Sequence, residues 1–141
     1  MTSEPQKPKA RILVAEDEQD IRELVSITMR LAGYQVWTAN DGQEAVALAP
    51  QVMPDLILMD VRMPKMSGFE ACAEMQKIPE LKDIPIVFLS AKGQETEIKR
   101  GLEAGAAAYI LKPFAPNELT SQIEELLNKL ISPAQASEES A

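Results

Sequence analysis

Five positions carry side chains that could bind a cation or handle a phosphoryl group, although most lie far apart along the chain. They are an acidic pair, a third acid, a hydroxyl and an amine: Glu16, Asp17, Asp60, Ser90 and Lys112. Each of them ends or follows a short apolar run. Oxygen ligands without histidine or cysteine favour a hard ion such as Mg²⁺, which proteins hold through one or two carboxylates, water and a phosphate. A lysine and a serine beside such an ion indicate phosphoryl chemistry.

The composition excludes several other kinds of site. The chain has 141 residues, no histidine and one cysteine, Cys72. A Ser-His-Asp triad, a Cys-His pair, a histidine-ligated metal and an intrachain disulfide are therefore ruled out. The net charge of −8 disfavours nucleic acid and anionic membrane surfaces as partners. The chain has no apolar run long enough to cross a membrane, residues 1–9 lack the apolar stretch expected of a signal peptide, and the single cysteine fits a cytoplasmic location.

Short apolar runs alternate with helical patterns along the chain. Strands are predicted at residues 11–15, 56–59, 86–89 and 109–111, with a more polar edge strand at 35–38. The four apolar runs are nearly continuous, as in parallel strands that are covered on both faces. A first helix, ending near Gly33, is predicted from an apolar stripe of Ile21, Leu24, Val25, Thr28 and Leu31.

The other helices are indicated mainly by their start signals. Asp41 and Ser67 are each followed three positions later by a glutamate, which is the spacing of a capping box. A fourth helix is predicted near residues 95–104. The last has a proline at its first position, Pro116, but a poor cap in Ala115.

A strand followed by a helix, repeated five times, predicts a parallel sheet with helices on both faces. Five units are too few for an eight-stranded barrel and fit a doubly wound, flavodoxin-like α/β fold with strand order 2-1-3-4-5. In such a sheet the carboxyl ends of the strands meet at one edge, so the five polar residues should gather there. Carboxylates about 4 Å apart repel by roughly 4 kcal/mol per pair, so a divalent ion, Mg²⁺ or Mn²⁺, is expected to neutralise them.

Each of these residues has an ordinary structural interpretation when it is taken alone. Asp17 and Ser90 could cap helices, Asp60 could be a turn residue, and Lys112 could be a solvated lysine. Cys72 and the methionines around Asp60 are interpreted as packing residues. The coincidence of all the polar residues at one sheet edge favours a site over these separate interpretations.

Four short motifs follow the predicted strands in a fixed order. They are Glu16-Asp17, the stretch from Asp60 to Gly68, Leu89-Ser90-Ala91 and Lys112-Pro113-Phe114. Together they resemble the receiver domain of two-component response regulators. The resemblance covers residues 10–131, which leaves 1–9 as a predicted flexible lead and 132–141 as a predicted disordered acidic tail.

The resemblance implies a phosphoacceptor role for Asp60, which would take a phosphoryl group from a phosphohistidine. Lys112 would pair with the phosphoryl oxygens, and Ser90 would hydrogen-bond to them. Tyr109 matches the aromatic residue that changes position on activation, and the Lys112-Pro113 bond is expected to be cis.

The resemblance also implies a ligand set for the metal. Asp17, Asp60 and the backbone carbonyl of Arg62 would hold Mg²⁺ directly, while Glu16 would act through a water molecule. Arg62 and Lys92 occupy two flanking positions that vary in the family, and we expect them to tune the lifetime of the phosphoryl group.

The expected function is that of a stand-alone receiver in a phosphorelay, similar to a chemotaxis-type regulator. A histidine kinase or phosphotransfer protein would be the donor. The fourth helix, fifth strand and fifth helix would present the surface for an effector protein, with no direct nucleic-acid contact. The chain would not be an enzyme beyond its own phosphorylation and dephosphorylation.

Four alternatives stay open at this point. The chain could be the receiver fragment of a longer transcriptional regulator, or a degenerate receiver that binds partners without phosphate. An aspartate-nucleophile phosphatase would need a second acid two residues after Asp60, where Arg62 stands. A flavin-binding protein would need a neutral phosphate cradle after the first strand instead of a run of three acids.

Overall fold

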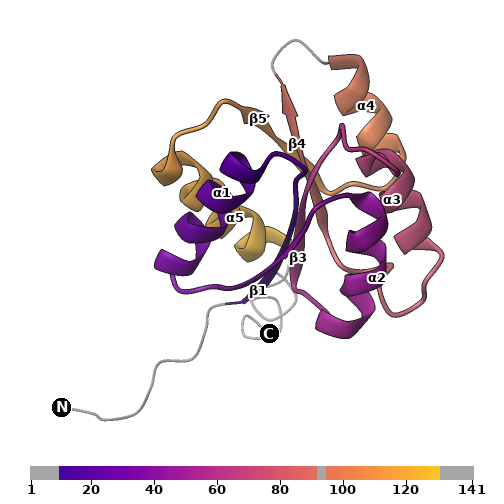
Figure 1. The fold of residues 1–141 in the computed structure, drawn as a ribbon, viewed down its shortest axis with the longest axis horizontal. Coiled ribbons are helices and arrows are strands. Elements are labelled where there is room, and N and C mark those ends of the chain that lie inside the picture. Colours follow the sequence, from indigo (N-terminus) through magenta and orange to yellow (C-terminus); the bar gives the residue numbers. More distant parts are fainter. Residues whose placement is uncertain (1–9, 92–94, 131–141) are drawn as a thin grey trace, which may run out of the picture.

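Five strands form one parallel sheet in the computed structural model, which describes residues 10–91 and 95–130. The strands are β1 (Arg11–Ala15), β2 (Gln35–Ala39), β3 (Leu56–Asp60), β4 (Ile86–Ala91) and β5 (Ala108–Lys112). Their order across the sheet is β2-β1-β3-β4-β5 (Figure 1). The predicted doubly wound fold is therefore confirmed. The predicted lead, the predicted tail and Lys92 lie outside the described residues.

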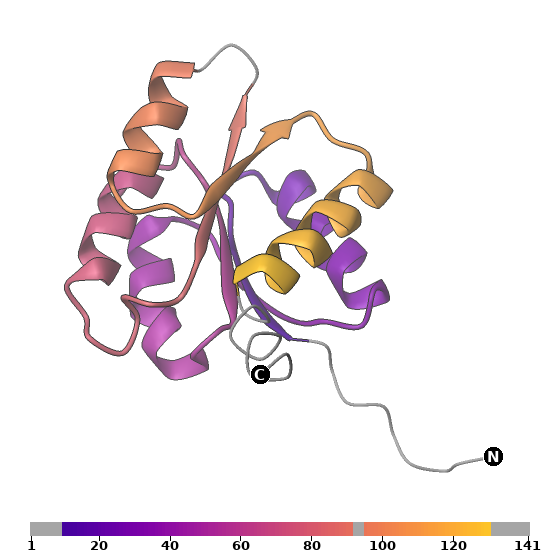
Figure 2. The same cartoon turned by 180° about the vertical axis from the view of Figure 1, so that it is seen from behind.

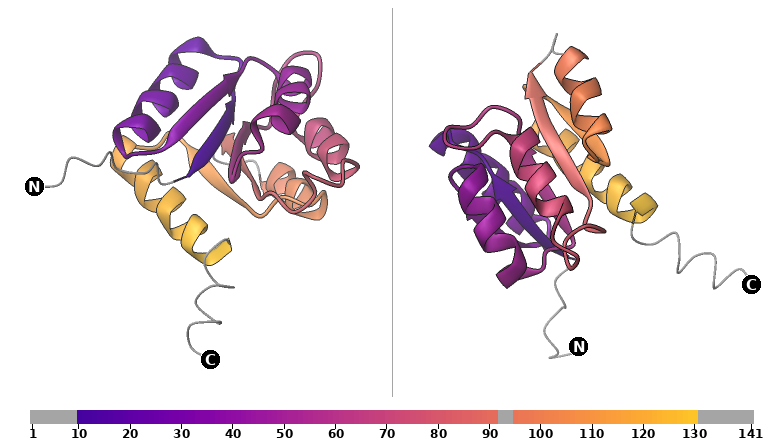
Figure 3. Two further views of the ribbon diagram at one scale, coloured as in Figure 1. Left: turned by 90° about the horizontal axis from the view of Figure 1, so that it is seen from below. Right: turned by 90° about the vertical axis from the view of Figure 1, so that its right-hand side faces the viewer.

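Helices cover both faces of this sheet. One face carries α1 (Gln19–Leu31) and α5 (Pro116–Leu130), and the other carries α2 (Gly42–Val52), α3 (Gly68–Gln76) and α4 (Glu95–Glu103) (Figures 1 and 2). Figure 3 shows the same three layers from two further sides.

Alternate residues of each strand enter two separate cores. Along β1, Leu13 packs into the core that contains residues of α2 and α3, while Ile12 and Val14 pack into the core beneath α1 and α5. All three side chains are fully buried. Burial on both faces explains why the strands are nearly continuous apolar runs in the sequence.

The predicted start signals of α2 and α3 are confirmed. The hydroxyl of Ser67 accepts a hydrogen bond from the Glu70 N–H at 3.1 Å, and the Ser67 N–H donates to the Glu70 carboxylate at 2.9 Å, which completes a capping box. Asp41 caps α2 by accepting from the Glu44 N–H at 2.8 Å. The Glu44 carboxylate reaches one residue further than in a standard box and accepts from the N–H of Asn40.

The weak cap of α5 has a partial substitute. The N–H of Ala115 donates to the carboxylate of Glu118 at 2.9 Å, which supplies half of a capping box although alanine offers no side-chain acceptor. Pro116 is the first residue of this helix, as predicted.

At the end of α1, Gly33 has a φ of 104°, a left-handed conformation that glycine adopts readily.

The buried face of α1 differs from the predicted stripe. Val25, Ser26 and Met29 are buried, whereas Leu24 is 43% exposed and Leu31 is 85% exposed. The helix packs against the core through Val25 and Met29, which lie four residues apart on one side of the helix. The buried hydroxyl of Ser26 has a hydrogen-bond partner, because it donates to the carbonyl of Arg22, one turn earlier, at 2.7 Å.

Strands β4 and β5 run further than predicted. Ser90 and Ala91 were expected to follow β4, but they pair within the sheet with Leu111 and Lys112 of β5. The pairing continues because both strands are parallel and in register to their last residues. Ser90 and Lys112 are therefore held by sheet hydrogen bonds instead of projecting from loops.

Candidate functional site

A cleft of about 230 Å³ opens at the carboxyl edge of the sheet. Its lining comes from the ends of the three strands β3, β4 and β5 and from the loops that follow β1 and β3. The lining residues are Asp17, Glu18, Asp60, Val61, Arg62, Ser90 and Lys112. The predicted gathering of remote polar residues at one edge is thus present in the structure.

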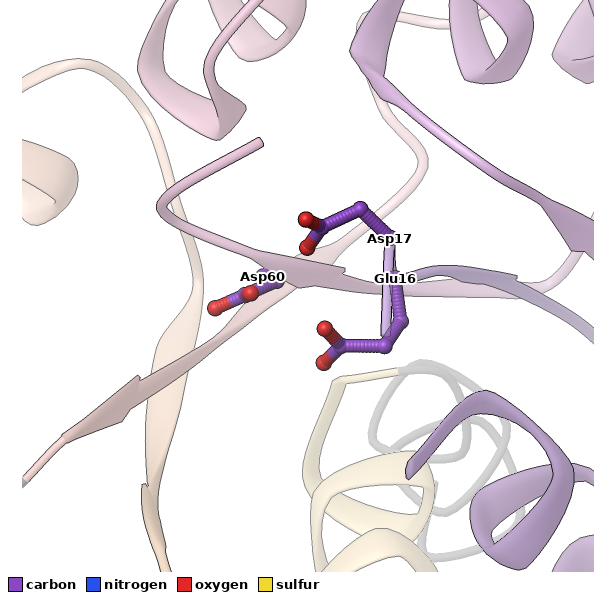
Figure 4. Close-up of side chains that lie close together, drawn as sticks. All are labelled: Glu16, Asp17 and Asp60. Carbon is purple, nitrogen blue, oxygen red and sulfur yellow. The ribbon is translucent and has the colours of Figure 1, made fainter. Parts of the chain in front are cut away.

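Three carboxylates meet beside this cleft. Asp60 is the last residue of β3, and Glu16 and Asp17 directly follow β1. Each offers an oxygen atom within 4.8 Å of the others, and Figure 4 shows the three side chains converging. Glu16 is fully buried and Asp60 is 7% exposed, while Asp17 is exposed. The cluster therefore opens to solvent on the Asp17 side.

Lys112 joins two of these acids from the end of β5. Its Nζ lies 3.2 Å from Oε1 of Glu16 and 3.3 Å from Oδ1 of Asp60. Burial alone would lower the pKa of Lys112, but the negative charges of Asp60 and Glu16 outweigh it and raise the pKa. The amine is therefore a permanent positive charge next to Asp60.

Both carboxylate oxygens of Glu16 are engaged by the protein. Oε1 accepts from Lys112, and Oε2 accepts from the N–H of Glu18 at 3.2 Å. Burial and the nearby charge of Asp60 raise the pKa of Glu16 from 4.5 to about 7, although Lys112 and the Glu18 N–H act in the opposite direction. Glu16 is thus an acid held inside the fold, which agrees with an indirect contact to any ion in the cleft.

The raised pKa of Glu16 predicts a dependence of stability on pH. Between about 4.5 and about 7, the folded chain holds a proton on Glu16 that the unfolded chain has lost. The free energy of unfolding should therefore fall as the pH rises through this window, by about 3 kcal/mol. Urea unfolding in EDTA, measured at several pH values across the window, gives the total slope, which contains this contribution from Glu16.

Glu16→Gln is the matched comparison, because glutamine fills similar space and does not titrate. The difference in unfolding free energy between Glu16→Gln and the wild-type chain should grow in favour of the variant as the pH rises. A difference that stays constant with pH would mean that the folded chain does not hold this proton.

The backbone after Asp60 returns tightly to the start of α3. The N–H of Gly68 donates to the carbonyl of Val61 at 2.8 Å. A β-carbon at position 68 would lie 2.4 Å from the carbonyl oxygen of Asp60, which is closer than real contacts allow. The glycine that ends this motif is therefore required by a close approach, and it fixes the strand end that carries Asp60.

Ser90 and Tyr109 occupy neighbouring strands on the same side of the sheet. Ser90 is 2% exposed and lines the cleft, whereas Tyr109 is 40% exposed. In the β4–β5 register Ser90 pairs with Leu111 and Phe88 pairs with Tyr109, so the side chains of Ser90 and Tyr109 point to the same face. Tyr109 thus stands outside the core in this structure.

The donor set fits a hard divalent ion. The acids beside the cleft offer only oxygen, and the exposed carboxylate of Asp17 lies close to that of Asp60 (Figure 4). The cis bond between Lys112 and Pro113 is confirmed. Cys72 and Met59 are fully buried in the core, as predicted, so neither takes part in the site.

Two residues near the site were not predicted to contribute to it. Glu18 lines the cleft, and Arg22, one turn into α1, donates hydrogen bonds to the loop that carries the acidic pair. Glu18 continues the acidic run and could have been included on that ground. The contact of Arg22 depends on the loop conformation, which the sequence pattern does not show.

A comparison with protein-family models decides the identity of this fold and site. The model of the response regulator receiver domain matches residues 12–124. The chain belongs to this family. The receiver domain thus accounts for nearly all of the described residues, and the chain is a receiver domain of the kind found in the response regulators of two-component signalling.

Curated relatives of this chain extend well beyond the matched receiver domain. The DNA-binding dual master transcriptional regulator RpaA of Synechocystis is 40% identical over 119 residues, which cover 84% of this chain and 49% of RpaA. The phosphate regulon transcriptional regulatory protein PhoB of Pseudomonas aeruginosa is 40% identical over 118 residues, which cover 84% of this chain and 52% of PhoB. The chain spans about half the length of the curated relatives it matches.

Solved structures include receivers of matching size. The chemotaxis response regulator CheY4 of Vibrio cholerae is 36% identical with a TM-score of 0.80, and the match covers 84% of this chain and 98% of CheY4. NtrX from Brucella abortus is 28% identical with a TM-score of 0.83, covering 92% of this chain and 29% of NtrX. The receiver fold therefore occurs among these neighbours both alone and within longer chains.

Proposed function

We propose that this receiver accepts a phosphoryl group on Asp60 from a histidine kinase or a phosphotransfer protein. The observation that carries the proposal is the meeting of three carboxylates within 4.8 Å of one another, with the Lys112 ammonium 3.3 Å from Asp60. In the transfer, a carboxylate oxygen of Asp60 bonds to phosphorus while the bond from phosphorus to the donor's imidazole nitrogen breaks. The imidazole leaves and takes its proton from solvent.

Positioning and charge support this role for Asp60. Its side chain stands at the end of a fully buried strand and opens into the cleft. Lys112 supplies a fixed positive charge for the phosphoryl oxygens, and the Ser90 hydroxyl lies in the same cleft lining. Preorganised charges of this kind contribute most of the catalysis in phosphoryl transfer.

A divalent ion, Mg²⁺ or Mn²⁺, would be held by Asp17, Asp60 and the backbone carbonyl of Arg62, with Glu16 acting through water. Asp17 and Asp60 each offer an oxygen atom within 4.8 Å of the other, and Arg62 lines the same cleft. When bound, the ion neutralises charge on the phosphoryl oxygens. Glu16 fits an indirect role because its own oxygens already bind Lys112 and the Glu18 N–H.

Phosphorylation would then change the surface formed by α4, β5 and α5. An aspartyl phosphate carries about two negative charges where the carboxylate carried one, and it brings new acceptor oxygens, which would draw in the Ser90 hydroxyl. We infer that Tyr109 moves inward in response. The exposed apolar side chains Leu102, Tyr109 and Leu111 on α4 and β5 offer a surface for an effector protein that senses this change.

The chemistry proposed here is self-phosphorylation and self-dephosphorylation without turnover of other substrates. An aspartate-nucleophile phosphatase would need a second acid at position 62, where the cleft has Arg62.

The lack of direct nucleic-acid contact and the cytoplasmic location remain predictions. Within the part of the chain that the structure describes, no helix has the length and apolar character needed to cross a membrane.

A second candidate is the receiver of a longer transcriptional regulator. The relatives RpaA and PhoB carry that function in their names, and the residues matched by this chain cover only 49% and 52% of them. An antibody raised against the receiver distinguishes the two in a lysate of the source cell. A band at the size of this chain supports the stand-alone receiver, and a clearly larger band, at the size of relatives such as RpaA and PhoB, supports the regulator.

Uptake of phosphate from a small donor tests the phosphoacceptor itself. The purified chain should gain one phosphoryl group from acetyl phosphate in the presence of MgCl₂, as measured by intact mass, and EDTA should prevent the gain. Uptake that is equally fast in EDTA, or no uptake at all, would contradict the proposal. Steady hydrolysis of p-nitrophenyl phosphate would instead favour the phosphatase.

A further inference from the structure

One arginine binds the loop that carries the acidic pair. The Nη1 atom of Arg22 donates to the carbonyl oxygen of Glu16 at 2.8 Å and lies 3.4 Å from that of Asp17. The backbone N–H of Arg22 donates to the carbonyl of Glu18 at 2.9 Å. A single residue, one turn into α1, therefore contacts three consecutive carbonyls of the loop.

The loop needs such a support because of the charges it carries. The Glu16 and Asp17 side chains both face Asp60, and carboxylates about 4 Å apart repel by roughly 4 kcal/mol per pair at a protein surface. Glu18 is the N-cap residue of α1, but its side chain makes no capping hydrogen bond. A side-chain cap at Glu18 therefore does not hold the loop against the repulsion between the carboxylates.

Arg22 acts from outside the cleft. It is absent from the cleft lining and belongs to a separate groove with Glu23, Ser26 and Arg30. Its guanidinium bonds to backbone carbonyls instead of carboxylates, so it leaves the acids available for a ligand. The carbonyl of Arg22 is itself bound by the Ser26 hydroxyl at 2.7 Å, which ties the arginine into α1.

We propose that Arg22 is a positioning residue for the divalent-ion site, where it holds the backbone carbonyls on either side of Asp17 in the ion-binding arrangement. The inference rests on the proposed function, because it takes the acidic cluster to be the ion site. Residues that orient metal ligands in this way typically contribute about 10-fold to 100-fold in metal affinity.

The direction in which the Mg²⁺ affinity changes when Arg22 is removed distinguishes a positioning role from a purely electrostatic one. If Arg22 acted only through its charge, its removal would strengthen Mg²⁺ binding, because one repelling positive charge near the acids would be gone. If Arg22 holds the loop, its removal weakens binding, because the acids can spread apart. The two explanations therefore predict opposite changes in the dissociation constant.

The experiment compares Arg22→Met with Arg30→Met. Both variants remove one guanidinium from α1 and keep an unbranched side chain. Arg30 also donates to a backbone carbonyl, that of Val36 in β2 at 3.1 Å, but this carbonyl is not part of the acidic loop. Calorimetric titration with MgCl₂ should show about a tenfold higher dissociation constant for Arg22→Met. Arg30→Met should bind Mg²⁺ like the wild-type chain.

A rate measurement gives a second readout. At a Mg²⁺ concentration near the wild-type dissociation constant, Arg22→Met should be phosphorylated by acetyl phosphate several-fold more slowly. At saturating Mg²⁺ its rate should return to the wild-type value. A merely structural role would lower the unfolding temperature in EDTA without this dependence on Mg²⁺.

The outcomes separate the inference from the proposed function. If the wild-type chain binds no Mg²⁺, the proposed function fails. If the wild-type chain binds Mg²⁺ and Arg22→Met binds it equally well or more tightly, the positioning role is overturned while the proposed function stands. If Arg22→Met does not fold, Arg22→Gln replaces it, and the same weakening of Mg²⁺ binding is expected.

Discussion

Asp60→Asn is expected to abolish the uptake of a phosphoryl group from acetyl phosphate. Asparagine keeps the size of the side chain but lacks the carboxylate oxygen that would bond to phosphorus. The substitution also removes one of the three charges in the acidic cluster, so the variant should fold at least as stably as the wild-type chain in EDTA. Intact mass after incubation with acetyl phosphate and MgCl₂ measures the loss.

Asp83→Asn is the matched control for this result. Asp83 is an exposed aspartate that precedes β4, at the opposite end of that strand from Ser90. This control should be phosphorylated like the wild-type chain. Normal phosphorylation of folded Asp60→Asn would show that another residue accepts the phosphoryl group.

Lys112→Met should slow phosphorylation by about 100-fold even at saturating Mg²⁺, a loss typical for removal of one preorganised donor. The ammonium lies 3.3 Å from Asp60, where charge develops on the transferring oxygens. Methionine keeps the apolar stem and removes the charge. Because Lys112 lowers the pKa of Glu16, that pKa should also rise above about 7 in the variant.

Lys82→Met provides the control for the loss of a lysine. Lys82 is exposed and lies before β4, at the edge of the sheet away from the cleft. Initial rates of phosphorylation, followed by intact mass, should match the wild-type rates for this variant. A Lys112→Met rate within a few-fold of wild type would exclude a role for the ammonium in the transfer.

Much of the fold could be predicted because burial on both faces leaves a plain pattern in the sequence. Leu13 and Val14 enter opposite cores, so β1 is apolar at consecutive positions. The helix starts at Asp41 and Ser67 could be predicted because a cap is a local contact between residues three positions apart. The meeting of Asp60 with Lys112 followed from topology, since parallel strands bring their carboxyl ends to one edge.

The rotation of α1 could not be predicted in the same way. Leu31 continues the apolar stripe but is 85% exposed, while Ser26 is buried. Apolar periodicity does not distinguish a core contact from an exposed apolar side chain, and a serine that bonds within its own helix can be buried at little cost. The helix orientation is instead set by how α1 packs against the sheet.

The support of the acidic loop was also hidden from sequence reasoning. Arg22 binds carbonyl oxygens, and Glu16 uses one oxygen for a backbone N–H. Backbone partners do not depend on residue type, so no motif records them. The sequence indicates which charges gather at this edge, whereas the way they are held depends on backbone contacts that appear only in the folded structure.

Mapping the phosphoryl group to a residue tests the central claim most directly. An aspartyl phosphate is reduced by borohydride to homoserine, which peptide mass spectrometry locates after the chain has been treated with acetyl phosphate and MgCl₂. The proposed function predicts homoserine at position 60 and at no other position. Homoserine at position 17, or a stable phosphate on Ser90, would contradict it.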